Sequence, residues 1–144
     1  MSGHGGYKHR KRNLAQKRRR VEASFARVAQ APAHLPLFYL AAGDARSAAR
    51  VISCNQEIAA DGAFALGMLA EFGPSIRERG AWWWRRLFWE SGVLGQVLYL
   101  EAEAAGIRGT GIGCYFDDVF HEVFGFQDDR FQSLYHFTAG GPVE

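Results

Sequence analysis

The chain has 144 residues, enough for one domain around a single core, and 48% hydrophobic and 14% aromatic residues supply that core. Its net charge of +2 hides an asymmetry: residues 1–20 hold eight lysines and arginines and no acid, whereas the rest holds nine against fifteen acids. Apolar runs fall short of the roughly 20 residues of a membrane span, and charges and prolines soon follow the basic start, so we expect neither a span nor a secretory signal.

The two cysteines, Cys54 and Cys114, lie sixty positions apart and form no CxxC pair. Such a pattern is not a disulfide framework, and it is typical of a reduced, cytoplasmic protein. No histidine or acid accompanies either cysteine in a pattern that would activate a thiolate. We therefore interpret both side chains as small buried hydrophobes.

Residues 1–30 are predicted to form a basic tail that is disordered, or a frayed helix over about residues 13–29, ahead of a domain over residues 31–144. Basic runs can bind nucleic acid by displacing its counterions. Because no aromatic residues interleave with the charges, a solvated tail is favoured over a nucleic-acid partner.

The elements before the centre of the chain are short. An apolar run after a proline predicts a strand over residues 35–41. Asp44 is expected to cap a helix over about residues 45–53, and a turn or short helical turn follows over residues 55–61. Residues 62–72 fit a strand better than a helix, because two glycines lower helix propensity and a Gly-Pro pair ends the segment.

The most informative element is a long predicted helix, Trp82–Ala105, closed by Gly106. Its middle, residues 91–100, carries no charge on any face. A helix that is apolar all round is expected to be buried, at the centre of a domain or in an oligomer interface. Gly92 and Gly95 lie in this middle, where glycine usually admits another backbone or a flat ligand.

The last part of the chain alternates glycine-rich and aromatic segments. A glycine ladder over residues 109–113 predicts a short strand and loop. Asp117 or Asp118 then caps a helix over about residues 119–124, ended by Gly125. Residues 130–139 predict a half-buried strand with Phe131, Ser133, Tyr135 and Phe137 on one side.

This succession of elements resembles the C-terminal half of the FMN-dependent nitroreductase family, in particular its thiazole/oxazole-forming dehydrogenase-like branch. The resemblance covers about residues 37–144 and is carried by the long helix from Glu90 to Gly106, the Thr-Gly-Ile-Gly segment ending at Gly113, the short helix ending at Gly125, and the final strand from Leu134 to Gly140.

The resemblance implies an α+β fold, with a mixed sheet flanked by helices and a long buried central helix. It implies a flavoprotein oxidoreductase that binds FMN at a homodimer interface formed by the Trp82–Ala105 helix. A nicotinamide cofactor, NAD(P)H, or a small-molecule substrate would deliver hydride to flavin N5, and the flavin would reduce an acceptor. The residues carried over to the flavin are Gly111, Ile112, Gly113, Tyr115 and Phe116; no catalytic residue or metal is implied.

This sequence also departs from the family. An Arg-rich, Ser-containing helix start and a basic residue after the last strand hold the FMN phosphate in the family, and neither has a recognisable counterpart here. The chain is therefore also compatible with a fragment of the family, or with a non-catalytic module that dimerises through the long helix.

Several residues can be interpreted either as functional or as purely structural. The GxGxG ladder follows a helix, whereas a dinucleotide fingerprint needs GxGxxG after a strand, so backbone approach to a flavin and a tight turn without ligand both remain open. Asp117, Asp118 and His121 could hold a divalent metal, but helix capping is simpler. His136 could donate a proton, although a strand histidine facing solvent or a neighbour is favoured.

The tryptophan-rich start of the long helix also has both a functional and a structural interpretation. The aromatic cluster comprises Trp82, Trp83, Trp84, Phe88 and Trp89. It could stack on a flavin or an aromatic substrate, and core or dimer packing explains it equally well. An ion pair between Arg86 and Glu90, four residues apart, is a simpler expectation than a phosphate contact.

Overall fold

A computed structural model of the chain describes residues 26–141, which fall into two compact units divided between Asp44 and Ala45. In the first unit, strands β1 (Ala26–Arg27) and β2 (Phe38–Tyr39) pair antiparallel. The strand predicted over residues 35–41 is thus only two residues long. Of the helix predicted over residues 13–29, residues 26 and 27 form a strand and the part before residue 26 lies outside the described residues. The predicted tail boundary at residue 30 remains a prediction.

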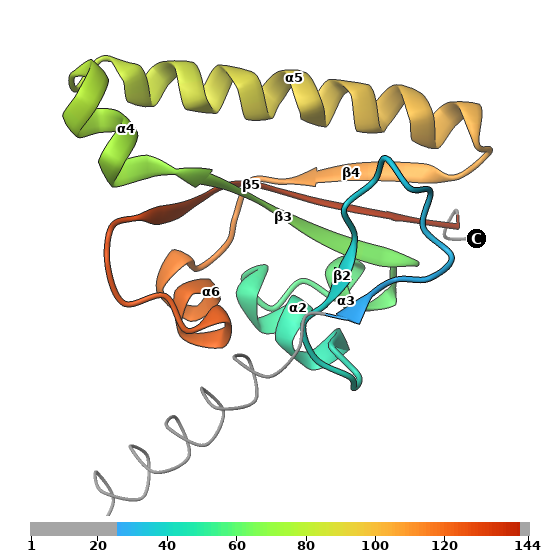
Figure 1. Cartoon of the computed structure of the whole chain (residues 1–144). Coiled ribbons are helices and arrows are strands. Elements are labelled where there is room, and N and C mark those ends of the chain that lie inside the picture. Colours follow the sequence, from blue (N-terminus) through green and yellow to red (C-terminus); the bar gives the residue numbers. More distant parts are fainter. Residues whose placement is uncertain (1–25, 142–144) are drawn as a thin grey trace, which may run out of the picture. The chain divides into compact units, whose positions relative to one another are not determined.

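The second unit is an α+β arrangement in three layers, with one long helix on one face of a sheet and short helices on the other (Figure 1). The sheet has the order β3-β5-β4, and every pairing among the described residues is antiparallel, where a mixed sheet was expected. The elements are α2 (Arg46–Ile52), α3 (Ile58–Asp61), β3 (Phe64–Glu71), α4 (Phe72–Arg79), α5 (Trp83–Ala104), β4 (Arg108–Ile112), α6 (Asp117–Phe124) and β5 (Phe131–Gly140).

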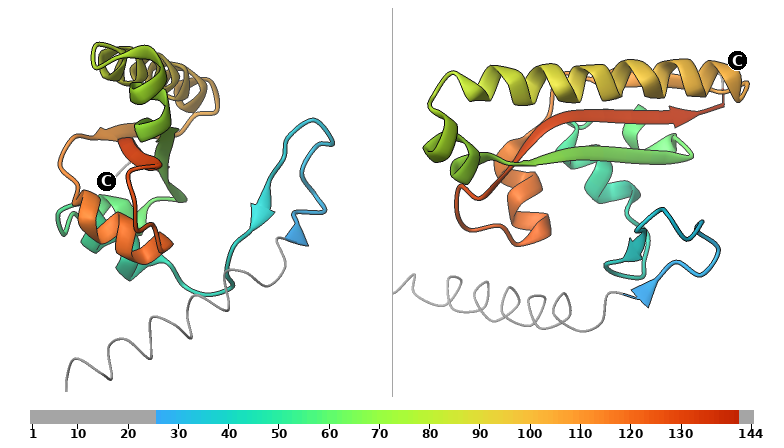
Figure 2. Two further views of the ribbon diagram at one scale, coloured as in Figure 1. Left: turned by 60° about the vertical axis from the view of Figure 1, so that its left-hand side comes forward. Right: turned by 45° about the horizontal axis from the view of Figure 1, so that its top comes forward.

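Strand β5 lies between β3 and β4 and is buried on both of its faces. Phe137 is 1% exposed and faces α5, whereas His136 is 4% exposed and lies on the face covered by α2 and α6. The predicted half-buried strand is therefore wrong in its burial, because helices cover both sides of the sheet (Figure 2).

A β-bulge breaks the side-chain alternation of β5. Met68 pairs with Tyr135, but Leu69 pairs with Ser133, so Leu134 is the extra residue. A bulge reverses the phase of the side chains that follow it. Ser133 consequently lies on the same face as His136, and the prediction that Ser133 shares a face with Tyr135 is wrong.

Helix α5 runs along one face of the sheet (Figure 2). Glycines in the helix and in β4 leave room for aromatic rings between the two layers. A Cβ atom at Gly95 would lie 2.7 Å from Cε1 of Tyr135, and one at Gly109 would lie 2.5 Å from Cζ of Phe137. Tyr99 of α5 stacks edge-on against Phe137, with ring centroids 5.0 Å apart. The other helix glycine, Gly92, has no atom within 4 Å of such a Cβ.

The opposite face of α5 is exposed, which corrects the expectation of a helix buried on most sides. Only three of its residues are buried, Ser91, Gly95 and Ala102. Trp89, Val93 and Leu100 are 67%, 65% and 61% exposed. The sheet covers one side of the helix, and nothing within residues 45–141 of the second unit covers the other. No helix in this part of the chain combines the length and apolarity that crossing a membrane requires.

Other boundaries follow from local chemistry. Helix α4 was not predicted, because the Gly-Pro pair looked like punctuation; Pro74 instead occupies the first turn, where its missing N–H costs nothing. The N-cap positions of α2 and α6 are Ala45 and Phe116, so the expected aspartate caps are wrong. Gly106 and Gly125 end their helices in left-handed conformations as expected, with φ of 71° and 77°.

The two glycines of α5 predict opposite responses to alanine. Gly92→Ala should raise the free energy of unfolding by about 1 kcal/mol, because alanine is the better helix former and has free space there. Gly95→Ala should lower it by about 1–3 kcal/mol, because the methyl group overlaps the Tyr135 ring. Urea unfolding of the two variants measures both effects; equal shifts in the same direction would contradict the packing of α5 on Tyr135.

Candidate functional site

The five residues predicted to lie beside a flavin follow one another from the end of β4 to the start of α6, but they do not form one surface. The backbone N–H of Gly111 donates to the Tyr99 hydroxyl at 2.6 Å, and the hydroxyl of Tyr135 fills the space that a side chain would need. Ile112 is 2% exposed and faces the other side of the sheet. Gly111 thus has a packing reason to be glycine, and its role toward a flavin remains a prediction.

The remaining three lie in the loop between β4 and α6. Gly113 is exposed, and no atom lies within 4 Å of the position that a Cβ atom would take there. Tyr115 stacks on His136 with ring centroids 4.1 Å apart, and burial, with Asp117 nearby, raises the pKa of its hydroxyl. Phe116 is 45% exposed, and its backbone N–H donates to the carbonyl of Ile52 at 2.8 Å. Gly113 and Phe116 are therefore the accessible part of the predicted set.

A disulfide between Cys54 and Cys114 joins this loop to the end of α2. Their Cα atoms lie 5.8 Å apart, within the normal range for such a bond. Both cysteines were expected to be reduced and buried, and this is wrong: the fold brings positions sixty residues apart together, and Cys114 is exposed. The predicted cytoplasmic location is therefore no longer supported by reduced thiols, and it remains a prediction.

Hydrogen bonds hold the same junction. The side-chain amide of Gln56 donates to the carbonyls of Ser53 and Cys114, at 2.9 and 3.1 Å. Cys54 and Asn55 both have left-handed backbones, with φ of 54° and 60°, which non-glycine residues rarely adopt. The end of α2 is thereby fixed against the loop that contains the accessible residues of the predicted site.

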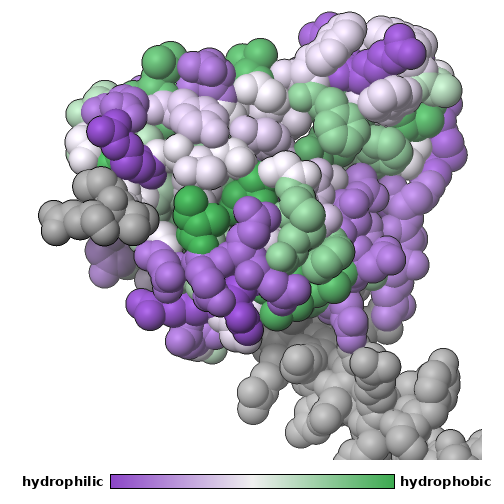
Figure 3. All heavy atoms as spheres, turned by 180° about the vertical axis from the view of Figure 1, so that it is seen from behind, coloured by the Kyte–Doolittle hydropathy of each residue, from purple (hydrophilic) through white to green (hydrophobic). Residues whose placement is uncertain are grey.

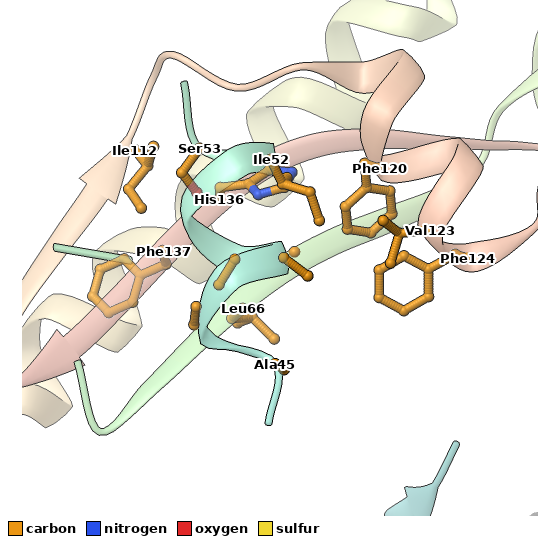
Figure 4. Close-up of a pocket in the computed structure, with 14 residues that line it drawn as sticks. Ala45, Ile52, Ser53, Leu66, Ile112, Phe120, Val123, Phe124, His136 and Phe137 are labelled. Carbon is orange, nitrogen blue, oxygen red and sulfur yellow. The ribbon is translucent and has the colours of Figure 1, made fainter. Parts of the chain in front are cut away.

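A cavity of about 160 Å³ lies between α2, α6 and the sheet (Figure 4). Its wall is almost entirely apolar. Figure 4 shows Phe120, Val123 and Phe124 of α6 on one side, and Ile52 of α2 with the flanking residues Ala45 and Ser53 on another. The remaining lining residues are Ala48, Ala49, Ala65, Leu66, Gly67, Ile112, His136 and Phe137.

His136 is the ionisable residue in this wall. The Ser133 hydroxyl and Nε2 of His136 are 2.6 Å apart, and the ring of Phe120 meets the imidazole edge-on at 5.2 Å between centroids. Burial lowers the pKa of His136 from its ordinary 6.5 to about 4, so the ring is neutral at neutral pH. The sequence left open whether His136 faces solvent or a neighbour, and the structure shows it facing neighbouring rings.

Sequence reasoning missed the Ser133–His136 pair. Three residues apart, the two side chains would lie on opposite faces of a regular strand, and only the bulge at Leu134 brings them together. No sequence signal marks that bulge.

The residues considered for a metal site, Asp117, Asp118 and His121, are not gathered around one point. Asp117 accepts a hydrogen bond from the amide of Gln132 at 2.8 Å. Nε2 of His121 is buried without a hydrogen-bond partner. Residues 26–141 bring no three potential His, Cys, Asp or Glu ligands together around a metal position.

The tryptophan-rich start of α5 stacks on arginines. Arg79 and Arg86 lie 4.3 and 5.2 Å from the ring centre of Trp83. The ion pair expected between Arg86 and Glu90 is present at 2.8 Å. These contacts organise the helix surface and leave Trp82 and Trp89 as exposed rings.

The cavity between α2, α6 and the sheet is too small for a flavin. Ligand pockets usually measure about 300–1,000 Å³, well above its 160 Å³. The Gly113–Phe116 loop instead offers an accessible surface for one side of a flat ring. FMN therefore fits these residues only as one side of a site.

The neutral state of His136 predicts a pH dependence of stability. Its pKa is lower in the folded protein than the usual 6.5 of the unfolded chain, so the unfolded chain takes up the proton first as the pH falls. Above pH 6.5 the protonation of His136 does not reduce the free energy of unfolding. Between pH 6.5 and pH 4 it lowers that free energy by up to about 3 kcal/mol. Urea unfolding across that range measures it.

The control is the double variant Ser133→Ala with His136→Phe, which replaces both hydrogen-bond partners by apolar groups. Its stability should fall less steeply over the same range, because the linked protonation of His136 is removed while every other titrating group is common to the two proteins. Equal slopes for the two proteins would contradict a buried neutral His136.

Comparisons with known proteins were made in three ways. No protein-family model matches the sequence, and no curated protein matches it. Among solved structures, the chain is similar to the crystal structure of a "putative nitroreductase" from Anabaena variabilis ATCC 29413, with a TM-score of 0.66 and 28% sequence identity. The match covers 75% of this chain but only 21% of that protein's length. The three layers built around β5 are therefore part of a nitroreductase fold.

Proposed function

We propose that this chain is the C-terminal portion of an FMN-dependent oxidoreductase of nitroreductase type, of the thiazole/oxazole-forming dehydrogenase-like branch. The observation that carries the proposal is the likeness to the Anabaena variabilis protein over three quarters of the chain. When bound, the flavin would take hydride at N5 from a nicotinamide cofactor or a substrate and pass electrons to an acceptor.

The accessible loop supports a flavin wall. Gly113 leaves its backbone open on the surface, and the exposed ring of Phe116 lies three residues further on. A flat aromatic ring can approach an unobstructed glycine backbone more closely than any other residue allows. Arg50 of α2, the helix whose end is fixed against this loop, is bound to Glu57 at 3.0 Å.

The exposed face of α5 supports a homodimer. Trp89, Val93, Val97 and Leu100 follow one another at spacings of four, four and three, so they form one stripe along the helix. In Figure 3, single green residues lie among purple and white ones along the top, where α5 runs. A contiguous apolar stripe of this length is unusual on a monomer and typical of an interface. A second copy would cover the stripe and bring another chain toward the flavin loop.

The proposed flavin site predicts that the chain binds FMN and that this binding depends on Gly113. Titrating FMN into the full chain and following flavin absorbance should give saturable binding, and Gly113→Val should weaken it at least tenfold by blocking the approach. Gly141→Val is the matched control, because a Cβ there also meets no atom within 4 Å. Absence of any binding, or equal loss in both variants, would overturn a flavin site at this loop.

The proposed homodimer through α5 predicts a molecular mass in solution that is twice the mass of the chain. Val93→Glu should shift sedimentation equilibrium toward the monomer, since it places a charge in the centre of the stripe. Val123→Glu, on α6 and 50% exposed, is the control and should leave the mass unchanged. A wild-type protein that sediments as a monomer would contradict the interface.

A second candidate function is a non-catalytic module that dimerises through α5. The exposed stripe favours it as much as it favours the enzyme, and flavin binding separates the two. A dimer that never binds FMN fits the module, whereas a dimer that binds it and loses it with Val93→Glu fits an enzyme completed across the interface. The nucleic-acid alternative rests on the basic run of residues 8–20, which lies outside the described residues and remains a prediction.

A further inference from the structure

We propose that the cavity between α2, α6 and the sheet binds a small phenol-type ring, whose hydroxyl group forms a hydrogen bond with Nδ1 of His136. The site lies within residues 45–137 and requires neither a flavin nor a second chain. It is thus independent of the proposed oxidoreductase function.

The size of the cavity suits a single ring. It measures about 160 Å³, and an apolar protein cavity of about 150 Å³ accommodates benzene. Small side chains create the space: Ala45, Ala48 and Ala49 lie on one face of α2, at spacings of three and one. On the sheet, Gly67 leaves room for Phe120, since a Cβ there would lie 2.6 Å from the Phe120 ring.

The wall is chemically suited to an uncharged aromatic ligand. Its large side chains are apolar, and none of its fourteen residues carries a charge at neutral pH. Val123 and Phe124 are 50% and 36% exposed although they line a hollow. A ring that fills the hollow removes this apolar surface from water, which is favourable in proportion to the area covered. A charged ligand would lose its hydration without a partner.

His136 supplies one oriented polar group. Its imidazole is fixed by the stack on Tyr115 and by the edge-on contact with Phe120, and Ser133 occupies Nε2. Nδ1 has no hydrogen-bond partner among the described residues. Figure 4 shows the ring between α2 and Phe120, at the wall of the cavity.

The tautomer of His136 decides what Nδ1 can bind. If Nε2 carries the proton and donates to Ser133, Nδ1 is an acceptor; if the Ser133 hydroxyl donates to Nε2, Nδ1 is a donor. A phenol hydroxyl both donates and accepts, so it satisfies either arrangement. A simple hydrocarbon ring satisfies neither, and this difference makes the two ligand classes separable.

The experiment is calorimetric titration of the full chain, without FMN, using phenol and toluene as probes. Both should bind with Kd of about 1 mM or below, the range for one buried ring. Ala49→Leu fills the cavity and should abolish binding of both. Ala104→Leu makes the same change on the exposed surface of α5 and should leave both affinities as they are. Circular dichroism confirms that both variants are folded.

The double variant Ser133→Ala with His136→Phe tests the hydrogen bond. It should weaken phenol binding about tenfold while toluene binding stays within a factor of about three, because only phenol then lacks a buried partner. Phenol binding that survives Ala49→Leu, equal losses of phenol and toluene in the double variant, or no binding of phenol to the wild-type protein would each overturn the proposal. Because no flavin is present, these outcomes are independent of the FMN titration.

Discussion

The contact between strand β5 and helix α5 governs the rest of the second unit. Tyr135 and Phe137 project from the central strand into space that Gly95, Gly109 and Gly111 leave open. With side chains at those glycines the helix would have to move away from the sheet. Since residues on the two faces of a strand alternate, the same strand then directs His136 and Thr138 to the opposite layer. Thr138 donates to the carbonyl of Phe64 there at 2.9 Å.

This arrangement divides the molecule into two chemically different surfaces. On one side, α5 presents an apolar stripe that extends beyond the sheet. On the other, α2 and α6 enclose a small apolar cavity with a single oriented imidazole. The end of β4 and the loop that follows it contribute to both surfaces: Gly111 packs under α5, whereas Ile112 and Tyr115 face the cavity side.

Much of the fold was readable from the sequence where the signal was local. The long helix, its end at Gly106 and the strands before and after it were predicted because length, glycine position and side-chain pattern suffice for them. Helix α4 escaped because Gly-Pro signals an ending as readily as a first helical turn. The burial of α5 was misjudged because apolar composition alone does not say whether the chain itself or another molecule covers a face.

The site was less predictable because it depends on contacts between distant residues. The resemblance selected the loop of Gly113 and Phe116, but no spacing in the sequence indicates the Ser133–His136 pair, which depends on one bulged residue. The disulfide was missed for a similar reason. A sixty-residue separation carries no information about distance until the strands between the two cysteines are paired.

That disulfide also changes how the chain would carry tension. Force applied to the two ends would pass along the covalent chain from Cys54 to Cys114 through the sulfur atoms, so the backbone of residues 55–113 would not be stretched. These 59 residues would contribute no extension, a shortening of roughly 200 Å in the length of the stretched chain. Strand β5 lies outside the bridged segment and between β3 and β4, so the same load would separate the sheet while the covalent loop that contains α5 stays closed.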